Sequence, residues 1–295
     1  MTELQKKILG LLTVFDKFCR ENQINYVMLG GTMLGAYRHK GFIPWDDDAD
    51  IGIPEKDFHR FLALASRKDG TGLPKEFSVR YRTLEQDIPY AFAHMEDKRT
   101  TYIEHRRSHE SYAGGVYIEI FPLTGCSNKK CMQILQEIKV IIDKRFLYGK
   151  IMDYAQKHRV FFKAILIKYI QKHYTIYELT GQLTKTVFHY PLEKSHYISN
   201  HLGHWGRKEN ILKEWMFPTI EYEFEGHQFF GVKEPERYLK ALYGQNFMIP
   251  PSLEEQKRGK HPAFFIDLKL PYEQYKAQKA VLSERERSNE RRSLL

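Results

Sequence analysis

Residues 27–53, VMLGGTMLGAYRHKGFIPWDDDADIGI, combine a glycine pair, a short basic segment and four aspartates. Carboxylates crowded this closely repel one another at neutral pH, so a bound cation is the simplest explanation for them. Mg²⁺ prefers carboxylate oxygens and usually keeps coordination positions for substrate phosphates. The stretch therefore predicts phosphoryl chemistry that depends on Mg²⁺, with Mn²⁺ as the other candidate cation.

The glycine pair separates a short apolar run from an expected helix. Residues 24–29 end at Gly30 and Gly31, as a buried strand does before a turn that needs glycine. Thr32 is placed to cap a helix that extends to about His39. Backbone amides in such a turn can approach a phosphate, and the helix start adds its positive dipole end. We therefore predict phosphate binding by Gly30, Gly31 and Thr32.

The aspartates lead into a second expected strand. Residues 48–53 alternate polar and apolar side chains, which places Asp48 and Asp50 on one face and the apolar residues in the core. Carboxylates about 7 Å apart along a strand can share one metal ion or hold two. We predict Asp46 as a further ligand, although Asp46 or Asp47 could instead cap the turn or hydrogen-bond to a ligand.

A third acid follows on another strand-like segment. Residues 116–122, VYIEIFP, come directly after two glycines. Glu119 lies between Ile118 and Ile120, and a carboxylate in such surroundings needs a partner or a metal ion. We predict that Glu119 joins Asp48 and Asp50 as a third metal ligand, with a salt bridge at the edge of the core as the alternative.

The rest of the chain predicts an α+β fold. Residues 3–21 have the three- and four-residue apolar steps of an amphipathic helix. The other expected segments are a helix at 54–66, short strands within 77–103, helices within 129–186, strands and turns within 212–232, and a loop-rich segment at 234–262.

Composition limits the class of protein. Hydrophobic residues make up 42% and aromatic residues 14%, which excludes wholesale disorder. The net charge of +9 indicates an anionic partner, which could be a nucleotide, a nucleic acid, an acidic lipid surface or a phosphorylated glycan. Three cysteines, a polar first segment and the lack of a long apolar run favour a cytoplasmic protein.

The helical middle of the chain is rich in aromatic and basic residues. Between Lys144 and Tyr177, tyrosines and phenylalanines alternate with lysines and arginines. One interpretation is a helical bundle with solvated basic faces. The other is a surface for an anionic membrane, with aromatic residues at the depth of the lipid headgroups.

The quoted segment, from Leu29 to Ile53, closely resembles the hallmark block of the LicD family, whose eukaryotic relatives include the fukutin and fukutin-related proteins. Residues 117–122 look like the second motif of that family, with glutamate where aspartate is common. Residues 229–251 look like its C-terminal signature. The resemblance covers roughly residues 20–122 and 205–262, and leaves out the helical middle.

The resemblance implies a nucleotidyltransferase-like mixed β-sheet flanked by helices, with a helical basic and aromatic insertion. The expected parts of the chain are a catalytic core at 1–125, a helical region facing membrane or acceptor at 126–200, a C-terminal part completing the site at 201–282, and a charged tail at 283–295.

The resemblance also implies a function. The family transfers phosphocholine, or a related phospho-alcohol, from a CDP-linked donor to a glycan. For this chain we expect CDP-choline as donor, release of CMP, and an acceptor hydroxyl on a cell-surface glycan such as teichoic acid or lipopolysaccharide, or on its lipid-linked precursor. Asp48, Asp50 and Glu119 would be the catalytic carboxylates. Peripheral contact with the inner face of the cell membrane fits such an acceptor, and no nucleic-acid partner is expected.

Several other residues are candidate substrate contacts. Arg38, His39 and Lys40 could neutralise a diphosphate or interact with the C-terminal end of their helix. Trp45 could pack the fold or face a quaternary ammonium group. His261 follows a basic run that could bind a phosphate-rich substrate or lie exposed.

Two other functions remain open on the sequence. One is nucleotidyl transfer to a small-molecule hydroxyl, with release of pyrophosphate. The other is a basic glycan-binding module with an inactive fold, which the intact set of acids disfavours.

Overall fold

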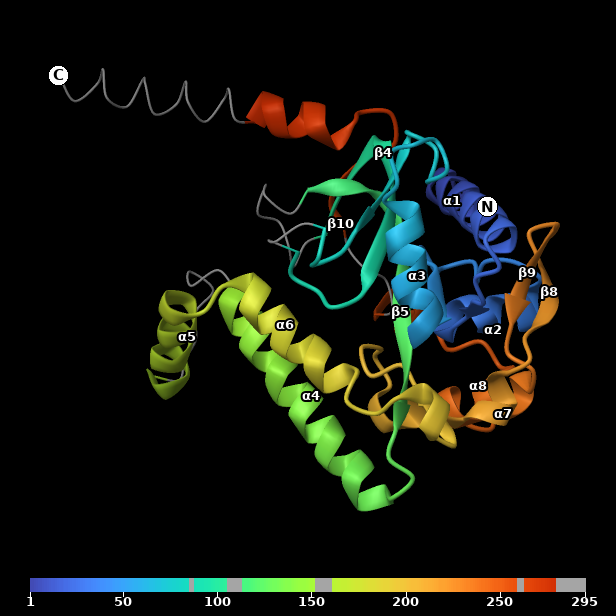
Figure 1. Ribbon diagram of the computed structural model, residues 1–295. Coiled ribbons are helices and arrows are strands. Elements are labelled where there is room, and N and C mark those ends of the chain that lie inside the picture. The colour runs from blue at the N-terminus through green and yellow to red at the C-terminus, as the bar shows by residue number, and fades with distance from the viewer. Residues whose placement is uncertain (85–87, 105–112, 152–160, 259–262, 280–295) are drawn as a thin grey trace.

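The computed structural model describes residues 1–84, 88–104, 113–151, 161–258 and 263–279, and within these ranges its centre is an eight-stranded mixed sheet (Figure 1). The main strands run in the order β1 (Val27–Met28), β2 (Asp50–Pro54), β5 (Gly114–Cys126), β4 (Ala93–Glu104) and β10 (Ala263–Asp267). β3 (Phe77–Arg80) pairs with β4, while β6 (Tyr197–Ser199) and β7 (Asn210–Leu212) extend the sheet from the end of β5.

Strand register brings the predicted acids together. β2 and β5 are parallel neighbours, with Asp50 opposite Glu119. β4 is antiparallel to β5, and its His94 is also opposite Glu119. Residues from three separate parts of the sequence therefore meet in one row across the sheet.

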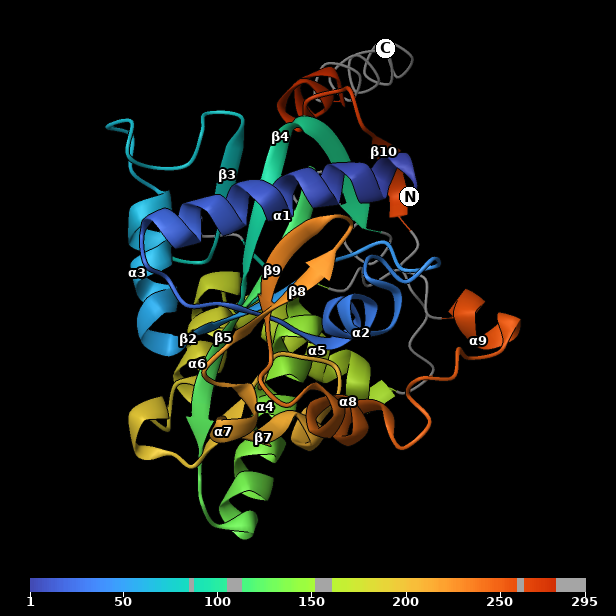
Figure 2. The ribbon, with the colours of Figure 1, turned by 90° about the vertical axis from the view of Figure 1, so that its right-hand side faces the viewer.

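Helices α1 (Glu3–Glu21) and α3 (Glu55–Ala65) cover the sheet, and Figure 2 shows α1 crossing β4 and β5. Both helices confirm the predictions from apolar spacing. The ring of Phe61 in α3 contacts Phe15 and Phe18 of α1, with centroids 5.5 and 6.0 Å apart. Together with the sheet they bury a continuous core.

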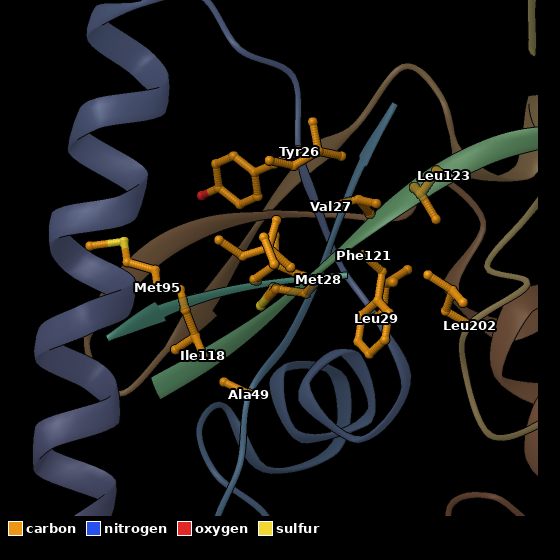
Figure 3. Close-up of a cluster of buried hydrophobic side chains, with 14 of the residues drawn as sticks. Tyr26, Val27, Met28, Leu29, Ala49, Met95, Ile118, Phe121, Leu123 and Leu202 are labelled. Atoms are coloured by element: carbon orange, nitrogen blue, oxygen red, sulfur yellow. The ribbon is translucent and has the colours of Figure 1, made fainter. Parts of the chain in front are cut away.

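This core lies directly beneath the acidic segment. Figure 3 shows Met28, Ala49 and Ile118 among its side chains, and each of them is fully buried. Ile51 and Ile53 of β2 are also fully buried, as the alternating pattern predicted. The apolar side of β2 thus fixes which side of the strand presents its carboxylates.

The second half of the chain is mainly helical, and the predicted helices of the middle region are confirmed for the described residues. Its elements are α4 (Lys130–Ile151), α5 (Phe161–His173), α6 (Ile176–Val187), η3 (Leu192–Lys194), η4 (Gly206–Glu209), α7 (Lys213–Met216), the hairpin β8 (Ile220–Phe224) and β9 (His227–Gly231), α8 (Pro235–Tyr243) and α9 (Leu253–Arg258). Among the described helices, none is both long and apolar enough to cross a membrane. Together with the eight-stranded sheet, these helices confirm the expectation of a mixed sheet flanked by helices.

Two local predictions around the glycine pair were wrong. The strand expected at 24–29 is limited to Val27–Met28, and Gly30 and Gly31 begin helix α2 (Gly30–His39) instead of forming a separate turn. The residue that precedes this helix is Leu29, in extended conformation, so Thr32 is not its cap. Thr32 instead lies in the first turn of α2, where its hydroxyl contacts strand β2.

Candidate active site

Asp50 and Glu119 occupy neighbouring positions on two parallel strands. The Glu119 N–H donates to the carbonyl oxygen of Ala49 at 2.9 Å, which fixes the register at this point. Asp48 and Asp50 keep partial solvent exposure, and the Glu119 side chain is 23% exposed. The three carboxylates therefore lie at the boundary between the core and solvent.

The acids act on one another electrostatically. Burial raises the pKa of Asp48 well above its usual value, and the charges of Asp50, Asp46, Glu119 and Asp47 raise it further. Burial and the charges of Glu119 and Asp46 likewise raise the pKa of Asp50. Ionising this cluster costs free energy in the protein alone, and a cation among the carboxylates would offset that cost.

The glycine pair allows the acids to approach the start of α2. A Cβ on Gly31 would lie 2.6 Å from Asp46 Oδ2, which is closer than van der Waals contact permits. Gly30 has a positive φ of 49°, and a Cβ there would lie 3.4 Å from Asp50 Oδ2. Glycine is thus required at Gly31 for space and at Gly30 for its backbone conformation.

Thr32 and Gln5 hold the acidic segment in place. The Asp50 N–H donates to Thr32 Oγ1 at 2.8 Å, and the buried Gln5 of α1 donates through Nε2 to the carbonyl oxygen of Asp46 at 2.8 Å. Both contacts join segments that are distant in sequence. They give Thr32 a positioning role in place of the predicted cap.

Two tyrosines of α8 complete this side of the site, and neither was predicted as a site residue. The Gly30 N–H donates to Tyr238 Oη at 2.9 Å, so this amide is engaged within the protein. Tyr243 Oη would lie 3.8 Å from a Cβ on Gly30. Burial raises the pKa of Tyr243, and the charges of Asp50 and Asp46 raise it further. Residues 242–244 were recognised as a family signature, but nothing local indicated the direction of these side chains.

Glu209 is a further acid that sequence reasoning missed. It is 6% exposed, accepts the Trp205 N–H at 3.0 Å, and its charge contributes to the raised pKa of Asp50. Burial raises the pKa of Glu209 to about 7, although Trp205 and Lys144 act in the opposite direction. No alternating or helical pattern marks Glu209, which lies in the short η4 segment.

A buried polar chain behind Glu119 was also missed. His94 is 2% exposed and lies between the rings of Tyr90 and Tyr117, with centroid distances of 4.1 and 3.9 Å. Its Nε2 is 3.5 Å from Glu119 Oε1, and its Nδ1 is 3.8 Å from Glu96 Oε1. The spacing of two residues between His94 and Glu96 on a strand was the available signal, since it places both on one face.

Glu96 lies at the far end of this row of buried polar side chains, and its neighbours keep it ionised. It is 1% exposed and lies 3.3 Å from the Arg80 guanidinium. Burial acts to raise the pKa of Glu96, but Arg80, His94 and the Gly115 N–H together lower it below its usual value. The side-chain contacts from Arg80 through Glu96 to His94 therefore fix the surroundings of Glu119 from inside the protein.

The predicted basic contacts lie at the other end of α2. Arg38 donates to the carbonyl oxygen of Phe247 at 2.7 Å, and its Nε lies 3.3 Å from His39 Nδ1. Lys40 is exposed and follows the helix in left-handed conformation. Trp45 is half-buried, and its ring lies edge-on to His39 with centroids 6.3 Å apart. His261 lies outside the described residues, so its predicted contact stays a prediction.

The donor chemistry of the site fits Mg²⁺. Within the described ranges, no three His, Cys, Asp or Glu side chains are already gathered around one point as metal ligands. Mg²⁺ commonly takes only one or two carboxylates and completes its coordination with water and substrate phosphates. Neighbouring carboxylates contribute to the raised pKa values of both Asp48 and Asp50, and a bound Mg²⁺ would neutralise part of this negative charge.

A cavity of about 300 Å³ lies between α4 and the segment from 201 to 210. Its lining includes Lys144, Arg207 and Trp205. The Trp205 ring contacts Tyr243, with centroids 4.9 Å apart, which connects the cavity wall to the group of acids. The cavity is large enough for a sugar or nucleoside portion of a substrate.

Comparison with known sequences defines the class to which this site belongs. The family model of the LicD/FKTN/FKRP nucleotidyltransferase domain matches residues 23–124, the part that carries Asp48, Asp50 and Glu119. By this match, residues 23–124 are similar to the nucleotidyltransferase domain of LicD, FKTN and FKRP.

Individual relatives extend this result. The chain is 29% identical over 262 residues to lipopolysaccharide cholinephosphotransferase LicD of Haemophilus influenzae, which covers 87% of this chain and 94% of that protein. It is 57% identical over 101 residues to an uncharacterized protein of Rickettsia prowazekii, covering 33% of this chain and 38% of the relative. Human ribitol 5-phosphate transferase FKRP is 34% identical over 65 residues, or 22% of this chain and 13% of that protein.

Proposed function

We propose that this protein transfers phosphocholine from CDP-choline to a hydroxyl of a cell-surface glycan or its lipid-linked precursor, releasing CMP. The observation that carries the proposal is the placement of Asp50 beside Glu119 at the start of α2, in a chain similar over most of its length to a lipopolysaccharide cholinephosphotransferase. A related phospho-alcohol in place of choline would use the same arrangement of carboxylates.

Each proposed role follows from position. Asp48 and Asp50 would hold Mg²⁺, with Asp46 as a further ligand, and the ion would supply positive charge to the oxygens around phosphorus. The acceptor hydroxyl oxygen forms a new bond to phosphorus while the bond from phosphorus to the CMP oxygen breaks. Glu119 takes the hydroxyl proton, with His94 behind it to hold its orientation.

A reaction with purified components tests the proposal. We expect CMP to form when the protein, Mg²⁺, CDP-choline and a glycan acceptor are combined, and CDP-ribitol and CDP-glycerol serve to define the alcohol. Pyrophosphate release from CTP with a small-molecule acceptor would instead support nucleotidyl transfer. Absence of both products with every donor would leave the glycan-binding alternative.

A further inference from the structure

Helix α4 is apolar on two sides. Val140 and Leu147 are buried against the rest of the protein, as expected of a packed helix. A second set of large apolar side chains lies at three- and four-residue steps on the exposed side of the helix. These residues are Ile134, Leu135, Ile138, Ile141 and Ile142, which are 39–57% exposed. A helix with solvent on one side ordinarily carries polar residues there.

Helix α5 adds to the same kind of surface. It packs beside the C-terminal part of α4, where a Cβ on Gly149 would lie 3.4 Å from Ile170 Cδ1. Ile165, Leu166 and Tyr169 of α5 are 49–53% exposed. We call the exposed apolar residues of α4 and α5, with the basic residues between them, the α4–α5 surface; Figure 1 shows these helices on the side of the molecule away from α1.

The charges on this surface have one sign. The exposed charged residues of α4 are Lys130, Lys139 and Arg145, and those of α5 are Lys168 and Lys172. None of the exposed residues of α4 is acidic, and the sequence of α5 contains no Asp or Glu. Apolar side chains interspersed with cations are the combination that binds the interface of an anionic bilayer.

We infer that the α4–α5 surface docks the protein on an anionic lipid bilayer, with the isoleucines of α4 at the boundary between headgroups and acyl chains. The charge decides between a bilayer and a second copy of the chain, because two identical basic surfaces would repel each other. The described helices are not suited to crossing the bilayer, so the contact is interfacial.

Docking by the α4–α5 surface would bring the substrate cavity close to the bilayer. This point rests on the proposed function. The inward side of α4 contributes Gln133, Glu137 and Lys144 to the cavity that reaches Trp205. The same helix would thus contact lipid on one side and border the substrate cavity on the other. A sugar attached to a lipid would then be held near the acids without leaving the bilayer surface.

Flotation with lipid vesicles tests the docking of the full-length protein. We expect binding to phosphatidylcholine vesicles that contain phosphatidylglycerol, and weakening of that binding by salt. The double variant Ile138→Ser/Ile142→Ser removes apolar area, and Ile220→Ser/Ile249→Ser is its control because these residues are 42% and 66% exposed elsewhere. Charge reversal by Lys139→Glu/Arg145→Glu is matched by Lys17→Glu/Lys68→Glu.

The α4 variants should each weaken vesicle binding at least about tenfold. One removes two cations that attract anionic lipid, and the other removes apolar area that enters the bilayer interface. The control variants should bind like the unmodified protein. Unchanged binding by both α4 variants, or no binding by the unmodified protein, overturns the inference. So does a dimer in light scattering that Ile138→Ser/Ile142→Ser dissociates. CMP release with a soluble acceptor should persist in all of these variants, which separates a failure of docking from a failure of the proposed reaction.

Discussion

The electrostatic cost of the acidic cluster is concentrated at Asp48 and Asp50. Both have raised pKa values because burial and neighbouring carboxylates disfavour their charged forms. A carboxyl group whose pKa is raised by folding makes the folded state less stable as pH rises through its titration. The protein therefore tolerates at this position a charge arrangement that lowers its own stability, as functional sites commonly do.

Replacing Asp50 should separate activity from stability. We expect Asp50→Asn to lower CMP release by on the order of a thousandfold, since a metal ion supplies several kcal/mol of charge stabilisation. Thermal unfolding without Mg²⁺ at neutral pH should be unchanged or occur at higher temperature, because one repelling charge is gone. Asp69→Asn, in an exposed turn, is the control, and full activity in Asp50→Asn would refute the assignment.

Addition of Mg²⁺ provides a second readout at the same residue. A ligand that binds only the folded protein raises its unfolding temperature. We expect Mg²⁺ to stabilise the unmodified protein and Asp69→Asn, and to have little effect on Asp50→Asn. Differential scanning fluorimetry measures the effect. Equal stabilisation of the unmodified protein, Asp69→Asn and Asp50→Asn by Mg²⁺ would show that the ion binds elsewhere.

Glu209 predicts a pH dependence of stability. Its pKa is about 7 in the folded protein and near 4.5 in the unfolded chain, so protons bind more tightly to the folded state. The free energy of unfolding should therefore fall as pH rises from about 4.5 to 7, by roughly 3 kcal/mol from this group. Glu209→Gln keeps the shape and an acceptor for Trp205, and should remove this falling contribution from the profile.

Denaturant unfolding across this pH range measures the effect. Glu21→Gln is a suitable control because Glu21 is 61% exposed on α1. An equal slope with pH in Glu209→Gln and the unmodified protein would rule out this assignment. In Glu209→Gln, the raised pKa values of Asp48 and Asp50 still make stability fall as pH rises. Burial lowers the pKa of His201 to about 4, and this group acts in the opposite direction in both proteins.

A side-chain hydrogen bond joins helix α2 to strand β2. Thr32 is 4% exposed, and its Oγ1 accepts the N–H of the catalytic candidate Asp50. The sequence indicated that Thr32 mattered, but for the wrong reason. Capping signals are local, whereas this contact depends on how the helix lies against the strand that follows it.

Removal of that acceptor should destabilise the protein. Thr32→Val keeps the shape but leaves the Asp50 N–H without its partner, and should lower the free energy of unfolding by about 1–3 kcal/mol. Thr32→Ser keeps the hydroxyl and should retain most of the stability and activity. The comparison uses urea unfolding together with CMP release, and equal values for the Val and Ser variants would contradict the positioning role.

The helices and strands were predicted best where apolar spacing was regular. α1, α3 and the apolar side of β2 follow directly from periodicity. The short strand β1 and the start of α2 were placed less well, because glycine fits both a turn and a helix start. In the folded protein the Gly30 N–H donates to Tyr238 Oη and Gly31 lies against Asp46, and both contacts come from outside the local sequence of the helix.

The catalytic candidates depend on residues from almost the whole chain. One cluster of buried hydrophobic residues extends from Ile8 to Phe247, and the end of β5 pairs with β6 from the second half of the chain. α8 supplies Tyr238 and Tyr243 to the start of α2. The part matched by the family model is therefore packed into a larger unit.

A fragment of residues 1–125 should not fold alone. It lacks β6 and the fully buried residues Phe224, Leu239 and Leu242 of the shared core. We expect the fragment to show no cooperative thermal transition by near-ultraviolet circular dichroism, while the full chain shows one. A cooperative transition in the fragment would establish the first 125 residues as an independent domain.

Sequence spacing was sufficient to identify the strand that carries Asp48 and Asp50, the glycine pair and the family resemblance. It could do so because these features lie within 27 consecutive residues, where side-chain alternation reports directly which side is buried. The contributions of His94, Glu209, Tyr238 and Tyr243 depended on strand register and helix packing between distant segments. Neither is encoded in local periodicity, so the surroundings that raise the pKa values of the acids became visible only in the folded chain.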